Sequence, residues 1–282
     1  MVFVFLIIIF VYVIISYYTN YKISTANYKL KTPLLIEQSS IKIVIVSDLH
    51  SGIHGKKQNT LINKIKYSEP DLIVLVGDIF DDFISLDGGK LLLSGISGFA
   101  PIYYVTGNHE RWSNDIKNIQ EILLSYGVTI LSDTYIKIEI NNNKIILAGI
   151  EDPAGKGNSN KKLYEIPNYD QDESMEKAFG ELDNILFYKI LLAHRPEKIE
   201  MYKKYSFDLV LSGHSHGGQF RIPCILNGVY APNQGIFPKY AGGVYTHEKL
   251  IHIISRGLSI KFKLPRIFNP PELVIVTIES DI

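Results

Sequence analysis

The stretch IKIVIVSDLH, residues 41–50, runs through apolar and β-branched side chains and ends in a polar group that contains Asp48 and His50. Such a run is typical of a strand that is buried on both faces of a parallel sheet. The same pattern, an apolar run that stops at polar residues, returns in DLIVLVGD (71–78), PIYYVTGN (101–108), ILFYKILLAHRP (185–196) and FDLVLSGHSHGGQF (207–220). The sequence therefore predicts a core of buried strands that share one kind of ending.

Segments with helical patterns separate these strands. Residues 58–68 predict a helix that Pro70 ends, and residues 114–126 and 175–182 predict two more. YIKIEI and KIILAGI, separated by three asparagines, predict a hairpin, and the tail from Val244 to ELVIVTIE predicts further short strands. Strands joined by helices indicate βαβ units, so we expect an α/β fold in which a second sheet packs on a largely parallel one.

The polar strand ends carry side chains that bind metal ions. In open α/β sheets, ligands bind beyond the carboxyl ends of the strands, so these side chains should meet. Taken singly, each could be a helix cap, a turn residue or a core histidine, but their recurrence at successive strand ends favours one shared site. The candidates have carboxylate, amide and imidazole groups, which suit Mn²⁺, Fe, Zn²⁺ or Mg²⁺; they are Asp48, His50, Asp78, Asn108, His194, His214 and His216.

Two details of this set suggest a pair of ions. Asp48 and His50 are two residues apart, and in an extended backbone such residues face the same way. Asp78 has two carboxylate oxygens and could bridge two ions. Glycines at positions 213, 217 and 218 would let the chain turn around His214 and His216.

The motifs resemble those of a known family, the calcineurin-like metallophosphoesterases. They are D-x-H at 48–50, G-D-x-x-D at 77–81, G-N-H-E at 107–110, a lone histidine at 194 and G-H-x-H at 213–216. The resemblance covers about residues 41–220 and implies a four-layer α/β-β/α sandwich. It also implies two divalent cations, for which we expect Mn²⁺ first: one bound by Asp48, His50, Asp78 and His216, the other by Asp78, Asn108, His194 and His214.

Several further residues are candidates for catalysis and substrate binding. A metal pair can clamp a phosphoryl oxygen and activate a bridging water. His109 could then donate a proton to the leaving oxygen, or could instead hold Asp48 in place. We expect Asp81 to orient His109 or a metal ligand. The candidate phosphate contacts, each of which could also form an ordinary ion pair, are Arg195, Arg111 and Arg256.

The first residues differ from the rest of the chain. Residues 2–18, VFVFLIIIFVYVIISYY, carry no charge and have about the 17–25 residues that a membrane helix needs. No basic residue precedes this run and no small-x-small cleavage site closes it, which favours a retained anchor over a signal peptide or a buried helix. We therefore expect a single-pass anchor in the cell (inner) membrane at 1–20, a linker at 21–40 and a catalytic domain at 41–282. Lysines at 22, 29 and 31 favour a cytoplasmic domain.

The charge composition and the expected membrane anchor narrow the range of possible substrates. The chain has 29 Lys and Arg against 29 Asp and Glu, so we expect no nucleic-acid partner, and its single cysteine excludes an internal disulfide. An anchor favours a lipid-linked phosphodiester or pyrophosphate. The segments HRP, GHSHGGQ and RGL are similar to those of membrane-anchored bacterial phosphoesterases, some of which cleave UDP-2,3-diacylglucosamine in lipid A synthesis. The alternatives are a nucleotide, cyclic-nucleotide or general phosphodiesterase, and a non-catalytic metal-binding membrane scaffold.

Overall fold

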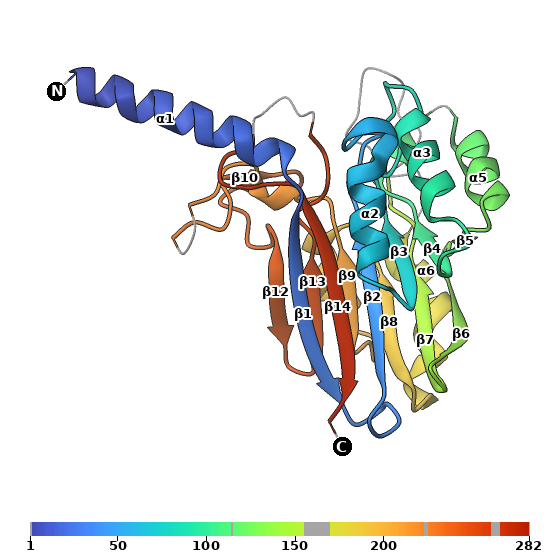
Figure 1. The fold of residues 1–282 in the computed structure, drawn as a ribbon. Coiled ribbons are helices and arrows are strands. Elements are labelled where there is room, and N and C mark those ends of the chain that lie inside the picture. The colour runs from blue at the N-terminus through green and yellow to red at the C-terminus, as the bar shows by residue number, and fades with distance from the viewer. Residues whose placement is uncertain (1, 114, 155–169, 223–224, 261–265, 282) are drawn as a thin grey trace.

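Two six-stranded sheets form the centre of the protein (Figure 1). The computed structural model describes residues 2–113, 115–154, 170–222, 225–260 and 266–281. The first sheet has the order β1-β14-β2-β3-β4-β5; its strands are β1 (Ser24–Thr32), β14 (Glu272–Ser280), β2 (Ser40–Val46), β3 (Leu72–Val76), β4 (Ile102–Val105) and β5 (Thr129–Ile130). Strands β2 to β5 are parallel, and β14 runs antiparallel to β2.

The second sheet has a parallel centre and antiparallel edges. Its order is β12-β13-β9-β8-β7-β6, and its strands are β12 (Gly243–His247), β13 (Leu250–Ile254), β9 (Leu209–Ser212), β8 (Tyr188–Leu192), β7 (Asn143–Gly149) and β6 (Thr134–Ile140). Strands β6 and β7 form the predicted hairpin, whose two-residue turn, Asn141 and Asn142, has positive φ at both positions. A short pair, β10 (Tyr230–Ala231) and β11 (Gly235–Ile236), lies outside both sheets.

Alternating side chains divide the molecule into layers. In β2, Ile43 and Ile45 belong to the core between the two sheets, whereas Val44 and Val46 pack toward helices. The helices packed on the first sheet are α2 (Asn59–Tyr67), α3 (Asp87–Ile96) and α5 (Ile116–Ser125) (Figure 1). The second sheet packs its other face on α6 (Gln171–Phe179) and α7 (Ile199–Tyr202). The result is the expected order of helices, sheet, sheet and helices.

Two segments differ from the expectation. Residues 24–32, which we expected within a linker, form β1, which pairs along its whole length with β14 at the other end of the chain. In β1 the side chains alternate between exposed and partly or fully buried, so one face is covered and the other is in water, and the strand lies at the edge of the sheet. Helix α6 begins at Gln171 rather than near 175, because the Asp170 carboxylate caps its first turn by accepting hydrogen bonds from the backbone N–H groups of Asp172 and Glu173.

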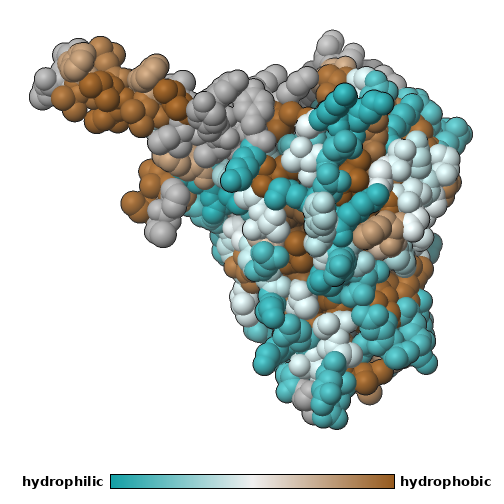
Figure 2. Space-filling view, in the orientation of Figure 1, coloured by the Kyte–Doolittle hydropathy of each residue, from teal (hydrophilic) through white to brown (hydrophobic). Residues whose placement is uncertain are grey.

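The first helix, α1 (Val2–Tyr21), projects away from the sheets (Figure 1). It exposes apolar side chains, among them Phe3 and Phe10, along the projecting part (Figure 2). Near the middle of the helix, the Tyr12 ring contacts the rings of Phe220 and Phe268. Within the described part of the chain, however, no helix combines the length and the apolarity that crossing a bilayer requires. The membrane anchor predicted for residues 1–20, and the placement in the cell membrane that followed from it, are therefore not supported.

One buried histidine in β13 predicts how stability depends on pH. His252 is fully buried, its Nε2 lies 3.0 Å from the Ser212 hydroxyl, and burial lowers its pKa to about 3. In the unfolded chain its pKa is about 6.5, so below that pH only the unfolded state takes up the proton. We expect the free energy of unfolding of the metal-free protein to fall between about pH 6.5 and pH 3, and His252→Gln to remove part of this slope. Urea unfolding followed by circular dichroism at several pH values measures both slopes, and equal slopes would contradict the prediction.

Candidate metal centre

Five strand ends supply the candidate ligands, and they meet at one edge of the two sheets. Asp48 and His50 follow β2, Asp78 follows β3, and Asn108 begins the short helix α4 (Asn108–Trp112) after β4. His194 follows β8, and the pair His214 and His216 follows β9, where a 3₁₀ turn (His216–Gly218) closes the segment. The parallel pairing of β2 with β3 and β4, and of β8 with β9, aligns these ends.

The backbone at these ligands is not extended. Asp48, His50, Asp78, His214 and His216 all have positive φ, between 46° and 67°, which is uncommon for residues other than glycine. Asp48 and His50 therefore lie on one side through a left-handed turn, and the expectation of an extended D-x-H was wrong. Such strained conformations persist where the surrounding structure fixes them, and they cluster at functional sites.

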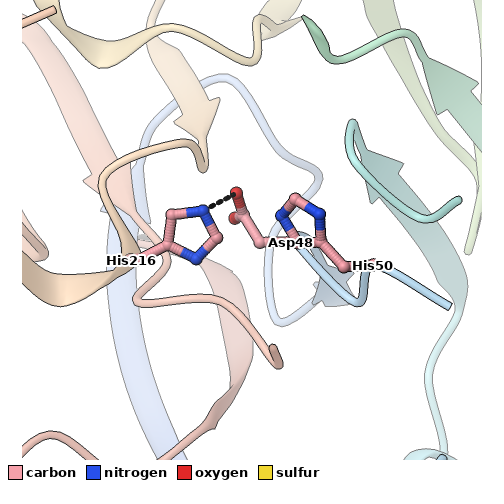
Figure 3. A group of neighbouring side chains, drawn as sticks. All are labelled: Asp48, His50 and His216. Carbon is pink, nitrogen blue, oxygen red and sulfur yellow. Dashed lines mark ion pairs between the residues drawn. The ribbon is translucent and has the colours of Figure 1, made fainter. Parts of the chain in front are cut away.

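The ligand side chains form two groups. In the first, one ligand atom from each of Asp48, His50 and His216 lies within 4.8 Å of the others (Figure 3). Here His216 Nε2 is 3.6 Å from the Asp48 carboxylate. The second group, with the same spacing, is Asp78, His194 and His214. Every residue of both groups is buried.

Asp78 connects the two groups. Its Oδ2 atom lies 3.6 Å from His50 Nε2, which belongs to the first group, and 3.2 Å from His194 Nε2 in the second. Asn108 stands beside it, because both neighbours of Asn108 in the chain, Gly107 and His109, pack against Asp78. The Asn108 Oδ1 atom is buried, and within the described residues nothing donates a hydrogen bond to it. A buried acceptor without a donor, next to a shared carboxylate, fits a pair of cations.

The charges of the site also fit cations. Burial lowers the pKa of His194, but the carboxylates of Asp78 and Asp48 more than reverse this and raise it to about 10. The two carboxylates thus favour positive charge at this point, and a divalent cation supplies it. Burial, together with His194, lowers the pKa of His214 to about 3, and burial also lowers that of His216. Both rings are therefore neutral, which is the form that binds metal.

Hydrogen bonds on the far side of the rings orient the imidazoles. His50 Nδ1 lies 3.2 Å from Asp81 Oδ2, and His194 Nδ1 lies 2.9 Å from the carbonyl oxygen of Val76. In each ring this leaves Nε2 to face the site. Asp81, which we expected to orient either His109 or a ligand, thus makes its closer contact with the ligand His50.

His109 has a different carboxylate partner. Its Nδ1 lies 2.6 Å from Asp82 Oδ1 and 3.7 Å from Asp81 Oδ2, and its backbone N–H donates to Asp78 Oδ1. The alternative that His109 holds Asp48 finds no support in these contacts. Burial lowers the pKa of His109, but Asp78 and Asp82 raise it to about 9, so at neutral pH both ring nitrogens are protonated and the imidazole is positively charged. Nothing in the sequence distinguishes Asp82 as the partner of His109 from the motif residue Asp81.

A buried glutamate organises two of the strand ends. The Glu110 carboxylate accepts hydrogen bonds from the backbone N–H groups of Asp78, Ile79 and Phe80 after β3 and from that of Gly107 after β4. It is completely buried. Glu110 appears in the sequence as the last letter of G-N-H-E, but the motif does not reveal this role.

The three candidate phosphate-binding arginines all make internal contacts. Arg195 forms two hydrogen bonds, of 2.7 and 2.9 Å, with the buried carboxylate of Asp152. Arg111 pairs with Glu151, and Arg256 pairs with Glu272. Each guanidinium therefore already has a carboxylate partner. The predicted contacts of these arginines with phosphate stay predictions.

This fold and site define a class of metal-dependent hydrolases. The chain belongs to the calcineurin-like phosphoesterase family, whose model matches residues 41–218. It is 30% identical over 255 residues to an uncharacterized metallophosphoesterase of Campylobacter jejuni, covering 86% of this chain and 60% of that protein. It is 29% identical over 274 residues to an uncharacterized metallophosphoesterase of Aquifex aeolicus, covering 94% and 95%. These relatives support assignment as a metal-dependent phosphoester hydrolase.

A solved structure with a similar fold is the 5'-nucleotidase precursor of Thermus thermophilus. It superposes with a TM-score of 0.52 at 14% sequence identity, over 78% of this chain and 49% of that chain. At this identity the likeness supports the fold alone. The chain spans about half of that protein and 60% of the Campylobacter one.

Proposed function

We propose that the protein is a dinuclear-metal hydrolase of phosphodiesters or pyrophosphates. The observation that supports this most directly is the position of the Asp78 carboxylate, which lies within 3.6 Å of a ligand nitrogen from each group. The first ion would be held by Asp48, His50, Asp78 and His216, and the second by Asp78, Asn108, His194 and His214. Divalent ions bound there, with Mn²⁺ as our first expectation, would polarise a phosphoryl oxygen and lower the pKa of a water molecule between them.

In this proposal, His109 supplies the proton for the leaving oxygen. The Asp82 contact fixes its Nδ1, so Nε2 is the atom that can reach a substrate. About a fifth of the side chain is exposed, whereas the ligands are nearly inaccessible. Asp81 and Asp82 have different roles in this proposal. Asp81 orients the metal ligand His50, and Asp82 orients His109, the general acid.

The proposed substrate carries an apolar group near the phosphate. Exposed apolar side chains follow two segments that contact the site: Phe83 and Ile84 come directly after Asp82, and Ile236 and Phe237 come shortly after Asn233, which contacts His214. Phe83, Ile236 and Phe237 are 71%, 70% and 67% exposed. A lipid-linked substrate such as UDP-2,3-diacylglucosamine would cover these surfaces, whereas a free nucleotide would leave them in water.

A panel of substrates tests the proposal. The Mn²⁺-loaded protein should hydrolyse bis-p-nitrophenyl phosphate and should have a higher kcat/KM for UDP-2,3-diacylglucosamine than for cyclic nucleotides. The double variant Phe83→Ser with Phe237→Ser should reduce this preference and leave bis-p-nitrophenyl phosphate hydrolysis unchanged. A preference for cyclic nucleotides would favour a nucleotide phosphodiesterase. A metal-loaded protein that is inert on every substrate would favour a non-catalytic scaffold.

The role of His109 gives a separate prediction. His109→Ala should leave the metal content unchanged and lower kcat by about 10² to 10⁴-fold, the usual contribution of a general acid. The loss should be larger for an alkyl ester, whose leaving oxygen needs a proton, than for a nitrophenyl ester. Asp82→Asn should show the same dependence on the leaving group with a smaller loss. Metal analysis and steady-state kinetics measure these effects, and an unchanged kcat would remove His109 from the mechanism.

A further inference from the structure

The turn that carries His214 and His216 is covered by a second segment of the chain. Val229 donates its N–H to the carbonyl oxygens of Gly218 and Phe220, and the chain then forms the β10–β11 hairpin. Gly218 and Gly228 approach so closely that a Cβ on Gly218 would lie 2.4 Å from the Gly228 Cα. The segment that leads into the hairpin is thus packed directly against the backbone that follows the G-H-x-H motif.

Gln234 fastens the tip of this hairpin. Its amide nitrogen donates to the Ser215 hydroxyl at 3.1 Å and to the carbonyl oxygen of Tyr240 at 2.9 Å, and its amide oxygen accepts from the Tyr240 N–H. Ser215 lies between the two histidine ligands in the chain. The preceding residue, Asn233, is therefore held in a fixed position beside them.

Asn233 contacts a metal ligand directly. Its Oδ1 lies 2.8 Å from His214 Nε2. Because an amide oxygen only accepts hydrogen bonds, Nε2 must donate. An imidazole whose single proton is on Nε2 has its lone pair on Nδ1. The contact thus selects the tautomer in which His214 can bind a cation through Nδ1.

We propose that Asn233 is a positioning residue for the second ion, the one assigned to Asp78, Asn108, His194 and His214. The inference rests on the proposed dinuclear centre and assigns a partner to one ligand of one ion only. Asp81 has the matching place in the first group, where it contacts His50 Nδ1 at 3.2 Å. The two partners come from different loops and contact different groups, so their effects on the two ions should be separable.

Metal titration of the full-length chain tests this. Mn²⁺ is titrated calorimetrically into metal-free wild-type, Asn233→Leu, Asn233→Asp and Asp81→Asn proteins. Asn233→Leu, which keeps the size of the side chain but removes the acceptor oxygen, should weaken the binding of one of the two ions about 10 to 100-fold and leave the affinity for the other unchanged. Asn233→Asp keeps an acceptor oxygen and should retain both affinities. Asp81→Asn should weaken the other ion, and electron paramagnetic resonance should show loss of the coupled Mn²⁺ pair in Asn233→Leu at limiting Mn²⁺.

Three results would overturn the inference. Unchanged binding of both ions by Asn233→Leu would show that the contact does not matter to the metal. Equal losses in Asn233→Leu and Asn233→Asp would show that the acceptor oxygen is not the cause. Equal weakening of both ions, with a lowered melting temperature of the metal-free protein, would show a general role in folding. The proposed function fails separately: a wild-type protein that binds two ions but hydrolyses no phosphodiester contradicts the hydrolase and not the role of Asn233.

Discussion

Asp78→Asn is expected to abolish phosphodiester hydrolysis and to prevent the two ions from binding as a pair. The Asp78 Oδ2 atom lies close to an imidazole nitrogen of each group, and the other carboxylate oxygen accepts the backbone N–H of His109. Asparagine keeps the shape but has no negative charge and has only one acceptor oxygen. A metal pair supplies several kcal/mol of transition-state stabilisation, and 1.36 kcal/mol corresponds to a tenfold rate, so we expect a loss of kcat/KM of about 10³-fold or more.

The other end of the same strand offers a matched control. Asp71 precedes β3, as Asp78 follows it, and its carboxylate accepts hydrogen bonds from the Lys42 backbone N–H and the Asn141 side chain. Asp71→Asn makes the same chemical change in a residue that touches no candidate ligand. It should keep two ions per chain and the wild-type kcat. Metal analysis after gel filtration and kinetics on bis-p-nitrophenyl phosphate compare the two variants, and two tightly bound ions in Asp78→Asn would refute the bridging role.

The layers and the meeting of the strand ends could be predicted from the sequence because both follow from local pattern. A buried parallel strand requires an apolar run such as residues 41–47, and parallel strands bring their carboxyl ends to one edge. Residues far apart in the chain, such as Asp48 and His216, therefore come together as a consequence of strand order. The edge strand β1 was missed for the same reason: its half-exposed pattern, STANYKLKT, is not an apolar run, and its partner β14 lies at the other end of the chain.

The partners of the site residues could not be predicted, because they depend on turn geometry. Asp81 and Asp82 are adjacent and chemically identical, and only the path of the chain after β3 decides which faces His50 and which faces His109. Asn233 lies in VYAPNQGIFP (229–238), a segment with glycine and proline that carries none of the recognised metal-ligand motifs. In the RGL segment, the need for glycine is also visible only in the structure. Gly257 has φ of +72°, and a Cβ there would lie 2.6 Å from the Asp48 Cβ.

Glu110→Gln is the substitution for which we expect the largest loss of stability. The carboxylate accepts four backbone hydrogen bonds, at 2.6 to 3.0 Å, from two loops that no strand pairing connects at that point. Glutamine has one acceptor oxygen, so its NH₂ group would face two N–H donors that it cannot satisfy. Burial and the neighbouring Asp78 raise the pKa of Glu110 to about 7, so the side chain is ionised above that pH. There, a hydrogen bond to a charged group contributes about 1.5–3 kcal/mol, so losing two should lower the free energy of unfolding by about 3–6 kcal/mol.

That loss is comparable with the whole stability of a typical domain, about 5–15 kcal/mol, so the experiment needs a condition in which the variant is still folded. Urea unfolding at low temperature measures the change, and Glu121→Gln, an exposed position on α5, provides the control for removing a surface carboxylate. Because Glu110 also fixes the backbone N–H of Asp78, the folded variant should bind the two ions more weakly as well. A change in unfolding free energy below about 1 kcal/mol would mean that water or a shifted backbone satisfies the freed N–H groups, and that Glu110 does not hold the two loops together.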